Sequence, residues 1–184
     1  MAAFKEPGDE VVGASIDTTS IGRFTEANLN GQGFGGLDAP AKSAYALPLR
    51  FSPGVGTVSI LVGLLLQSPV WLGSMAIVAL TGALWPRGML LDLVYNLSVR
   101  HLFHAPRLPA TPSPRRFSYG LSTVLLTGSS VCFAYGAVGL GFVLGGMVVL
   151  GGSILTASLW CLGSWWFRLL SSAAGGRPWV NTLP

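Results

Sequence analysis

Asp92 is the residue of this sequence best suited to acid–base or ion chemistry, because it is the only carboxylate after residue 38. Asn96 and Arg100 follow it at intervals of four, which on a helix places the three side chains on one face. A lone carboxylate in apolar surroundings is energetically costly unless it is paired with another group or hydrated. We therefore interpret Asp92, Asn96 and Arg100 as a polar cluster at an interface, in which Asp92 bonds Asn96 or an arginine such as Arg100 or Arg87. A proton or ion site at Asp92 is the alternative.

Two histidines close to this cluster could hold a cofactor. His101 and His104 lie three residues apart, and a neutral imidazole is a ligand for haem iron or for the magnesium of chlorophyll. Their position next to arginines at a polar boundary favours surface histidines instead. Because two histidines without a third ligand are an incomplete set, we assign no metal site and no catalytic residue.

The two cysteines, Cys132 and Cys161, both lie inside apolar runs and have no CxxC partner. This arrangement predicts neither a disulfide framework nor a zinc site. A free buried cysteine packs as a small apolar residue.

The composition argues against an ordinary soluble enzyme. The chain is 51% hydrophobic and 10% charged, whereas soluble domains carry about 25% charged residues. All acidic residues except Asp92 lie before residue 39, and residues 51–184 contain seven arginines and no lysine. These arginines are dispersed singly around apolar runs, and a nucleic-acid-binding protein would need them clustered on one face. We expect no nucleic-acid partner.

Two long apolar runs predict an all-α, polytopic membrane protein with four transmembrane helices arranged as two hairpins. Ser68-Pro69 interrupts the first run and Tyr135 to Gly141 interrupts the second, and each break predicts a hairpin turn. The membrane domain is expected over residues 51–170, with spans at about 54–66, 70–85, 117–135 and 141–168.

Polar segments surround these spans. Residues 88–104 have one polar and one apolar face at helical spacing, which predicts an amphipathic helix in the membrane interface, and the four prolines that follow predict an exposed connector. Residues 1–50 are polar and glycine-rich, so we expect a soluble, irregular, extended arm that cannot fold alone. Residues 171–184 are predicted to be a short polar tail.

The arginines also predict the orientation of the chain. They fall on one side of the four predicted spans, whereas both hairpin turns are uncharged. By the positive-inside rule, we expect both termini on the cytoplasmic side of a bacterial inner or photosynthetic membrane, or on the stromal side of a thylakoid.

Small residues recur at helical spacing in the second apolar run, and such rows let helix backbones approach closely in lipid. Packing within the chain's own hairpin is the favoured interpretation, and packing against helices of a partner is the alternative. The residues concerned are Gly128, Cys132, Gly136, Gly141, Gly145 and Gly152.

Several motifs follow one another from Leu49 onward: the first hairpin, Trp85-Pro86-Arg87, the proline-rich connector, Arg116-Phe117, and Trp160-Cys161-Leu162-Gly163-Ser164. Over residues 49–170 this order resembles a bacterial four-helix membrane family known as domain of unknown function 4395. In that family the last motif usually reads Phe-Cys-Leu-Gly-Cys, a CxxC that implies thiol or sulfur redox work. Here the second cysteine is replaced by Ser164, so Cys161 alone cannot form the internal disulfide.

Taken together, these features favour a non-catalytic accessory or structural subunit of a larger membrane complex, in a photosynthetic or respiratory assembly. Docking is expected through the glycine-rich helix faces and the N-terminal arm. The expected partners are other membrane subunits and lipids, with a lipid, (bacterio)chlorophyll or carotenoid bound at a subunit interface as an option. The alternatives are a membrane thiol or sulfur redox protein that uses Cys161, and a small-solute carrier, which the scarcity of polar residues in the spans disfavours.

Overall fold

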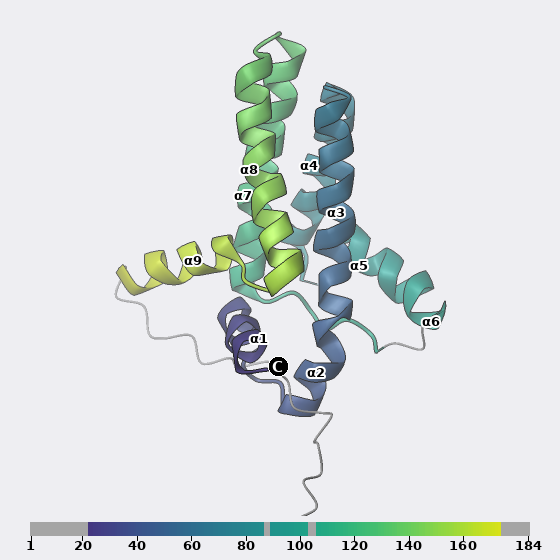
Figure 1. Cartoon of the computed structure of the whole chain (residues 1–184), viewed down its shortest axis with the longest axis vertical. Coiled ribbons are helices and arrows are strands. Elements are labelled where there is room, and N and C mark those ends of the chain that lie inside the picture. Colours follow the sequence, from purple (N-terminus) through teal and green to yellow (C-terminus); the bar gives the residue numbers. More distant parts are fainter. Residues whose placement is uncertain (1–21, 87–88, 103–105, 174–184) are drawn as a thin grey trace, which may run out of the picture.

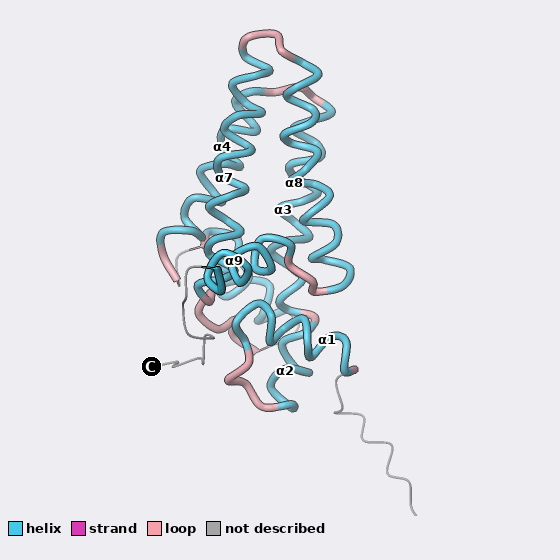
Figure 2. Tube along the Cα trace, turned by 90° about the vertical axis from the view of Figure 1, so that its left-hand side faces the viewer, coloured by secondary structure: helices cyan, strands magenta, loops and turns pink. Residues whose placement is uncertain are grey.

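The computed structural model describes residues 22–86, 89–102 and 106–173, and this part of the chain is all-α, with no strand. Long helices stand side by side in a bundle, and shorter helices gather at one end of it (Figures 1 and 2). The long helices are α3 (Pro48–Leu65), α4 (Pro69–Leu84), α7 (Ser113–Ala134) and α8 (Val138–Ser158). The shorter ones are α1 (Arg23–Leu29), α2 (Ala39–Ala46), α5 (Leu90–Val94), α6 (Arg100–Leu102) and α9 (Leu162–Ala173).

Two tight turns join the long helices into hairpins. Between α3 and α4, Gln67 adopts a left-handed conformation with φ 48°, and the Ser68 hydroxyl caps α4 by accepting from the backbone N–H of Trp71 at 3.3 Å. Between α7 and α8, Gly136 has φ 78°, a conformation that favours glycine. The two hairpins pack with α4 against α7 and α3 against α8.

Apolar side chains fill the space between the hairpins, and many others face outward. The buried cluster comprises Ile60, Leu64, Leu72, Ala76, Leu126 and Phe133. On the outer surface, large apolar residues such as Val58, Val70, Val124 and Leu150 are each more than 60% exposed. An apolar exterior of this extent is typical of a surface that contacts lipid or a partner.

Three stretches are long and apolar enough to cross a membrane: Ala39–Leu65, Ser113–Ala134 and Val138–Ser158. The helix α4 has 16 residues and extends about 24 Å, which is shorter than the roughly 30 Å hydrocarbon core of a bilayer. The structure therefore has three helices long and apolar enough to span rather than the four that the sequence predicts, and α4 is a shorter apolar helix.

The predicted span at 141–168 is wrong, because the helix that begins at Val138 ends at Ser158. Leu159 adopts a left-handed conformation with φ 55°, and α9 then runs crosswise to the bundle (Figure 1). The carbonyl groups at this turn are taken by side chains of the N-terminal segment: Asn28 Nδ2 donates to the oxygen of Ser158 at 2.8 Å, and Gln32 Nε2 to that of Leu159 at 2.5 Å. These contacts satisfy carbonyls that a continuing helix would have bonded itself.

The N-terminal segment is not the irregular arm that we expected, at least from residue 22 onward. It forms α1, a π-helical turn over Asn30–Phe34, and α2, all of which lie under one end of the bundle (Figure 2). Its isolated apolar residues pack against residues from the rest of the chain, and this long-range burial stabilises its helices. The shared core consists of Leu29, Phe34, Leu49, Tyr95, Leu108 and Leu159. Residues 1–21 lie outside the described part.

The boundaries of two further elements differ from the prediction. The helix α3 begins at Pro48 rather than near residue 54, and it continues through Pro53. The expected amphipathic helix over 88–104 consists of α5, a π-helical turn over Tyr95–Val99, and α6. Both ends of the expected range, and the tail beyond residue 173, lie outside the described residues.

Candidate functional site

A buried arginine marks the end of the bundle where α3, α5, α7 and α9 come together. Arg115, in the first turn of α7, is 3% exposed, and its Nη2 donates to the backbone oxygen of Leu49 at 3.2 Å. Its Nε has no hydrogen-bond partner. A buried charge with incomplete pairing is costly, so this position is unlike the exposed arginines that merely orient a membrane protein.

Asp92 faces the same region, but it bonds neither Asn96 nor Arg100, and Arg87 lies outside the described residues. Its carboxylate accepts a short hydrogen bond from the Ser52 hydroxyl and a second one, at 3.5 Å, from Thr111. It also contributes electrostatically to the environment of Arg115, although no direct ion pair joins the two within the described residues. The carboxylate is thus held between α3, α5 and the connector before α7.

Asn96 and Arg100, the other members of the predicted polar cluster, have separate partners. Asn96 Oδ1 accepts from the backbone N–H of Leu108 at 2.8 Å, and Arg100 Nε donates to His101 Nε2 at 3.3 Å. The π-helical turn that begins at Tyr95 widens the helix between these residues, so that the four-residue spacing no longer aligns them. Burial raises the pKa of the Tyr95 phenol, and the nearby charge of Arg100 partly offsets this effect.

The candidate cofactor histidines are not brought together. His101 is exposed, and its Nε2 is the acceptor for Arg100. His104 lies outside the described residues. In the described part of the chain, no group of three or more His, Cys, Asp and Glu side chains could hold a metal ion.

Tyr119 lies one turn after Arg115 on α7 and is a residue that the sequence reasoning did not select. The Arg115 guanidinium lies 5.9 Å from the centre of the Tyr119 ring. The Tyr119 side chain is 9% exposed, and no hydrogen bond of ordinary length and angle reaches its hydroxyl. The only signal for it in the sequence is the i, i+4 pairing of an arginine and a tyrosine at the start of an apolar span.

Cys161 lies at the start of α9 and connects this helix to α7. Its Sγ is 3.0 Å from the hydroxyl oxygen of Ser118, and its carbonyl accepts from the backbone N–H of Trp165 at 3.0 Å. The adjacent Gly163 allows the close approach, because a Cβ there would lie 2.9 Å from the Cα of Ser118. Ser164, which replaces the second cysteine of the family motif, is 2% exposed, and its hydroxyl has no partner.

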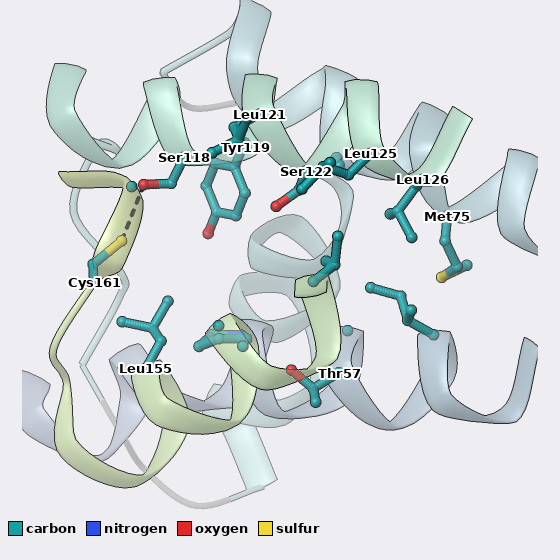
Figure 3. A pocket seen from close by; sticks show the side chains of 18 of the residues that line it. Thr57, Met75, Ser118, Tyr119, Leu121, Ser122, Leu125, Leu126, Leu155 and Cys161 are labelled. Carbon is teal, nitrogen blue, oxygen red and sulfur yellow. Dashed lines mark hydrogen bonds between the residues drawn. The ribbon is translucent and has the colours of Figure 1, made fainter. Parts of the chain in front are cut away.

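A cavity of about 220 Å³ opens beside these residues (Figure 3). The hydroxyl of Tyr119 and that of Ser122 point into it, and Ser118 and Cys161 close one side. Most of the remaining wall is apolar and comes from α3, α4, α7 and α8. Leu126, Leu155, Met75 and Met147 are representative of this wall.

Most of the predicted packing residues face side chains of the same bundle, and one lies in a turn. A Cβ at Gly145 would clash with Leu64 and would lie 3.0 Å from Ser129 Oγ. A Cβ at Gly141 would lie 3.0 Å from the Phe133 ring. A Cβ at Gly152 would clash with Thr57. Gly128 faces Leu144 at 3.1 Å, and Cys132 is partly buried on the same helix. Gly136 belongs to the turn, where a Cβ would meet nothing within 4 Å, and so lies on no packing face.

Comparison with known proteins identifies the family. Residues 47–172 match the family model described as domain of unknown function (DUF4395). No curated protein and no solved structure matches the chain. Since the model spans more than half of the sequence, the resemblance seen in the motifs is confirmed, and this chain belongs to the DUF4395 family.

Proposed function

We propose that this chain is an integral membrane protein in which both hairpins are embedded in the bilayer, with the end that carries α9 on the cytoplasmic or stromal side. Three of its long helices are apolar enough to span, and α4 lies between two of them. Arg115, Arg116 and Arg168 lie at the α9 end, whereas the two hairpin turns at the opposite end are uncharged (Figure 1). This distribution of arginines supports the orientation by the positive-inside rule.

We further propose that the protein is a non-catalytic accessory subunit that packs against a helix of a larger membrane complex. The observation that carries this proposal is the outward face of α8. Gly139, Gly146 and Ser153 recur every seven residues, and a Cβ at either glycine would meet nothing within 4 Å. Val143 and Leu150 lie between them and are 59% and 66% exposed.

Alternating small and large residues on one helix face create holes and knobs for a second helix. Glycine inside a helix costs about 0.5–1 kcal/mol relative to alanine. Contact with fluid lipid tails does not offset this cost, whereas close van der Waals packing against another helix does. The face formed by these five residues, which we call the outer α8 face, therefore supports a partner helix.

Gentle detergent extraction followed by native mass measurement tests this function. We expect the chain to migrate with other membrane proteins, which are then identified by peptide sequencing. A species that contains only copies of this chain would contradict the accessory role. A photosynthetic or respiratory host stays a prediction, and the identity of the co-migrating chains decides it.

A second candidate, thiol chemistry at Cys161, is favoured by one specific observation. The Cys161 sulfur lines the cavity and contacts Ser118, so a thiol stands at the edge of a space that a small molecule could enter. A Cys161→Ala variant with unchanged thiol-dependent activity in membranes would exclude this function. The Ser118→Ala variant is the matched control, because it removes the contact to the sulfur but keeps the thiol.

A further inference from the structure

We propose that the cavity lined by α3, α4, α7, α8 and α9 binds an uncharged, lipid-soluble molecule that carries a carbonyl oxygen. This inference is independent of the accessory role, because the cavity and the outer α8 face involve different residues. The uncharged wall of the cavity, the hydroxyl groups that point into it and its size together favour such a ligand.

The wall of the cavity carries no charge. None of its lining residues is Asp, Glu, Lys, Arg or His, and the buried Arg115 is not among them. Placing an ion in such surroundings without a partner costs several kcal/mol. Three methionines, Met75, Met89 and Met147, give the wall an adaptable apolar surface. The occupant is therefore mostly apolar and has no net charge.

Several hydroxyl groups of α7 line the cavity and can donate hydrogen bonds, and Ser52 and Thr57 of α3 add hydroxyl groups on another side. The hydroxyl of Tyr119 is buried, no hydrogen bond of ordinary length and angle reaches it, and it points into the cavity, as does the hydroxyl of Ser122 from the next turn of the same helix (Figure 3). An unsatisfied buried hydroxyl costs about 1–3 kcal/mol. A ligand with an oxygen acceptor at this position would remove that cost, and a pure hydrocarbon would not.

The size of the cavity limits the ligand to about one substituted ring. A dry cavity of about 150 Å³ accepts benzene, and this one has about 220 Å³. The lining residues Leu121, Met147 and Trp166 are also exposed, so the cavity opens to the outer surface of the bundle and a molecule dissolved in lipid can enter.

The test uses the purified full chain in detergent micelles with two probes of equal size. Acetophenone carries a carbonyl, and isopropylbenzene carries a CH–CH₃ group in its place. We expect both to bind, with acetophenone about fivefold tighter, and we expect the infrared C=O band of bound acetophenone to shift to lower wavenumber. In Tyr119→Phe, which removes the hydroxyl and keeps the ring, the preference and the band shift should be lost.

Gly151→Leu and Gly146→Leu distinguish the cavity from the micelle. Both positions lie on α8 and have nothing within 4 Å of an added Cβ, but only Gly151 lines the cavity. Gly151→Leu should abolish binding of both probes, and Gly146→Leu should leave it unchanged. Equal uptake by the wild type and Gly151→Leu would overturn the proposed site. Binding of both probes with equal affinity, unaffected by Tyr119→Phe, would overturn the choice of a carbonyl ligand.

Discussion

The sulfur of Cys161 lies 3.0 Å from the hydroxyl oxygen of Ser118, and this contact joins the residue immediately before α9 to α7. The contact is possible because Gly163 lets the two helices approach closely. It places Cys161 in a packed position at the edge of the cavity rather than on the outer surface.

Cys161 should therefore react slowly with thiol reagents in the folded protein. In a Cys132→Ser background, a maleimide is expected to label Cys161 much more slowly in mild detergent than after unfolding in SDS, because its residue is only 7% exposed. Mass spectrometry measures the labelled fraction over time. Equal rates in the two conditions would mean that Cys161 is accessible and that the α7–α9 contact does not persist.

The buried guanidinium of Arg115 should contribute more to stability than a surface arginine. Arg115→Met removes the hydrogen bond to the carbonyl of Leu49, so we expect the free energy of unfolding to fall by about 2–3 kcal/mol in an SDS titration. The exposed Arg107 is the matched control, and Arg107→Met should change the free energy of unfolding by less than about 0.5 kcal/mol.

Combining Arg115→Met with Asp92→Asn tests whether the two charges depend on each other. We expect the double variant to lose less stability than the sum of the two single variants, because each single change leaves the other charge uncompensated. Strict additivity would show that the two side chains act independently.

Two neighbouring glycines of α8 should respond in opposite directions to the same substitution. Gly145→Ala would force a Cβ against Leu64 and Ser129, and we expect it to destabilise the fold by about 1–3 kcal/mol. The Cβ added by Gly146→Ala would have no atom within 4 Å, so this substitution should stabilise the helix by about 0.5–1 kcal/mol. Thermal unfolding of both variants in one detergent measures the difference. A similar response at both positions would contradict the packing of α3 against α8.

The turn after α8 should depend on two polar side chains of the N-terminal segment. Removing both donors in Asn28→Ala, Gln32→Ala leaves the carbonyls of Ser158 and Leu159 without these partners, and we expect a loss of about 1–3 kcal/mol. Asn30→Ala, at an exposed position between the two, is the control and should have little effect. Faster hydrogen exchange at residues 159–164 in the double variant, and not in the control, would locate the effect.

The sequence predicted those parts of the fold whose signals are local. Ser68-Pro69 and Gly136 mark the hairpin turns because a capping hydroxyl, a proline and a positive φ act within a few residues. The end of α8 has no such signal: neither glycine nor proline stands at Leu159, and the donors that satisfy the turn come from Asn28 and Gln32, far away in the chain.

The candidate site was harder to predict for the same reason. The sequence singles out Asp92 as the one carboxylate after residue 38, but its partners Ser52 and Thr111 come from other segments, and a π-helical turn lies between it and Arg100. Arg115 was counted with the arginines that set orientation, since nothing in its sequence neighbourhood distinguishes a buried arginine from an exposed one.

The accessory role is tested most directly by the fraction of the chain that migrates in a larger complex after gentle extraction, compared between wild type and Gly146→Leu. A Cβ at this position meets nothing within 4 Å, and the rest of the leucine side chain would fill the outer α8 face, so the variant should insert and fold normally while its complexed fraction falls at least about tenfold. Thr127→Leu, at an exposed position on α7, should leave the fraction unchanged. An unchanged fraction in Gly146→Leu, or a wild-type chain that migrates without other proteins, would contradict the account.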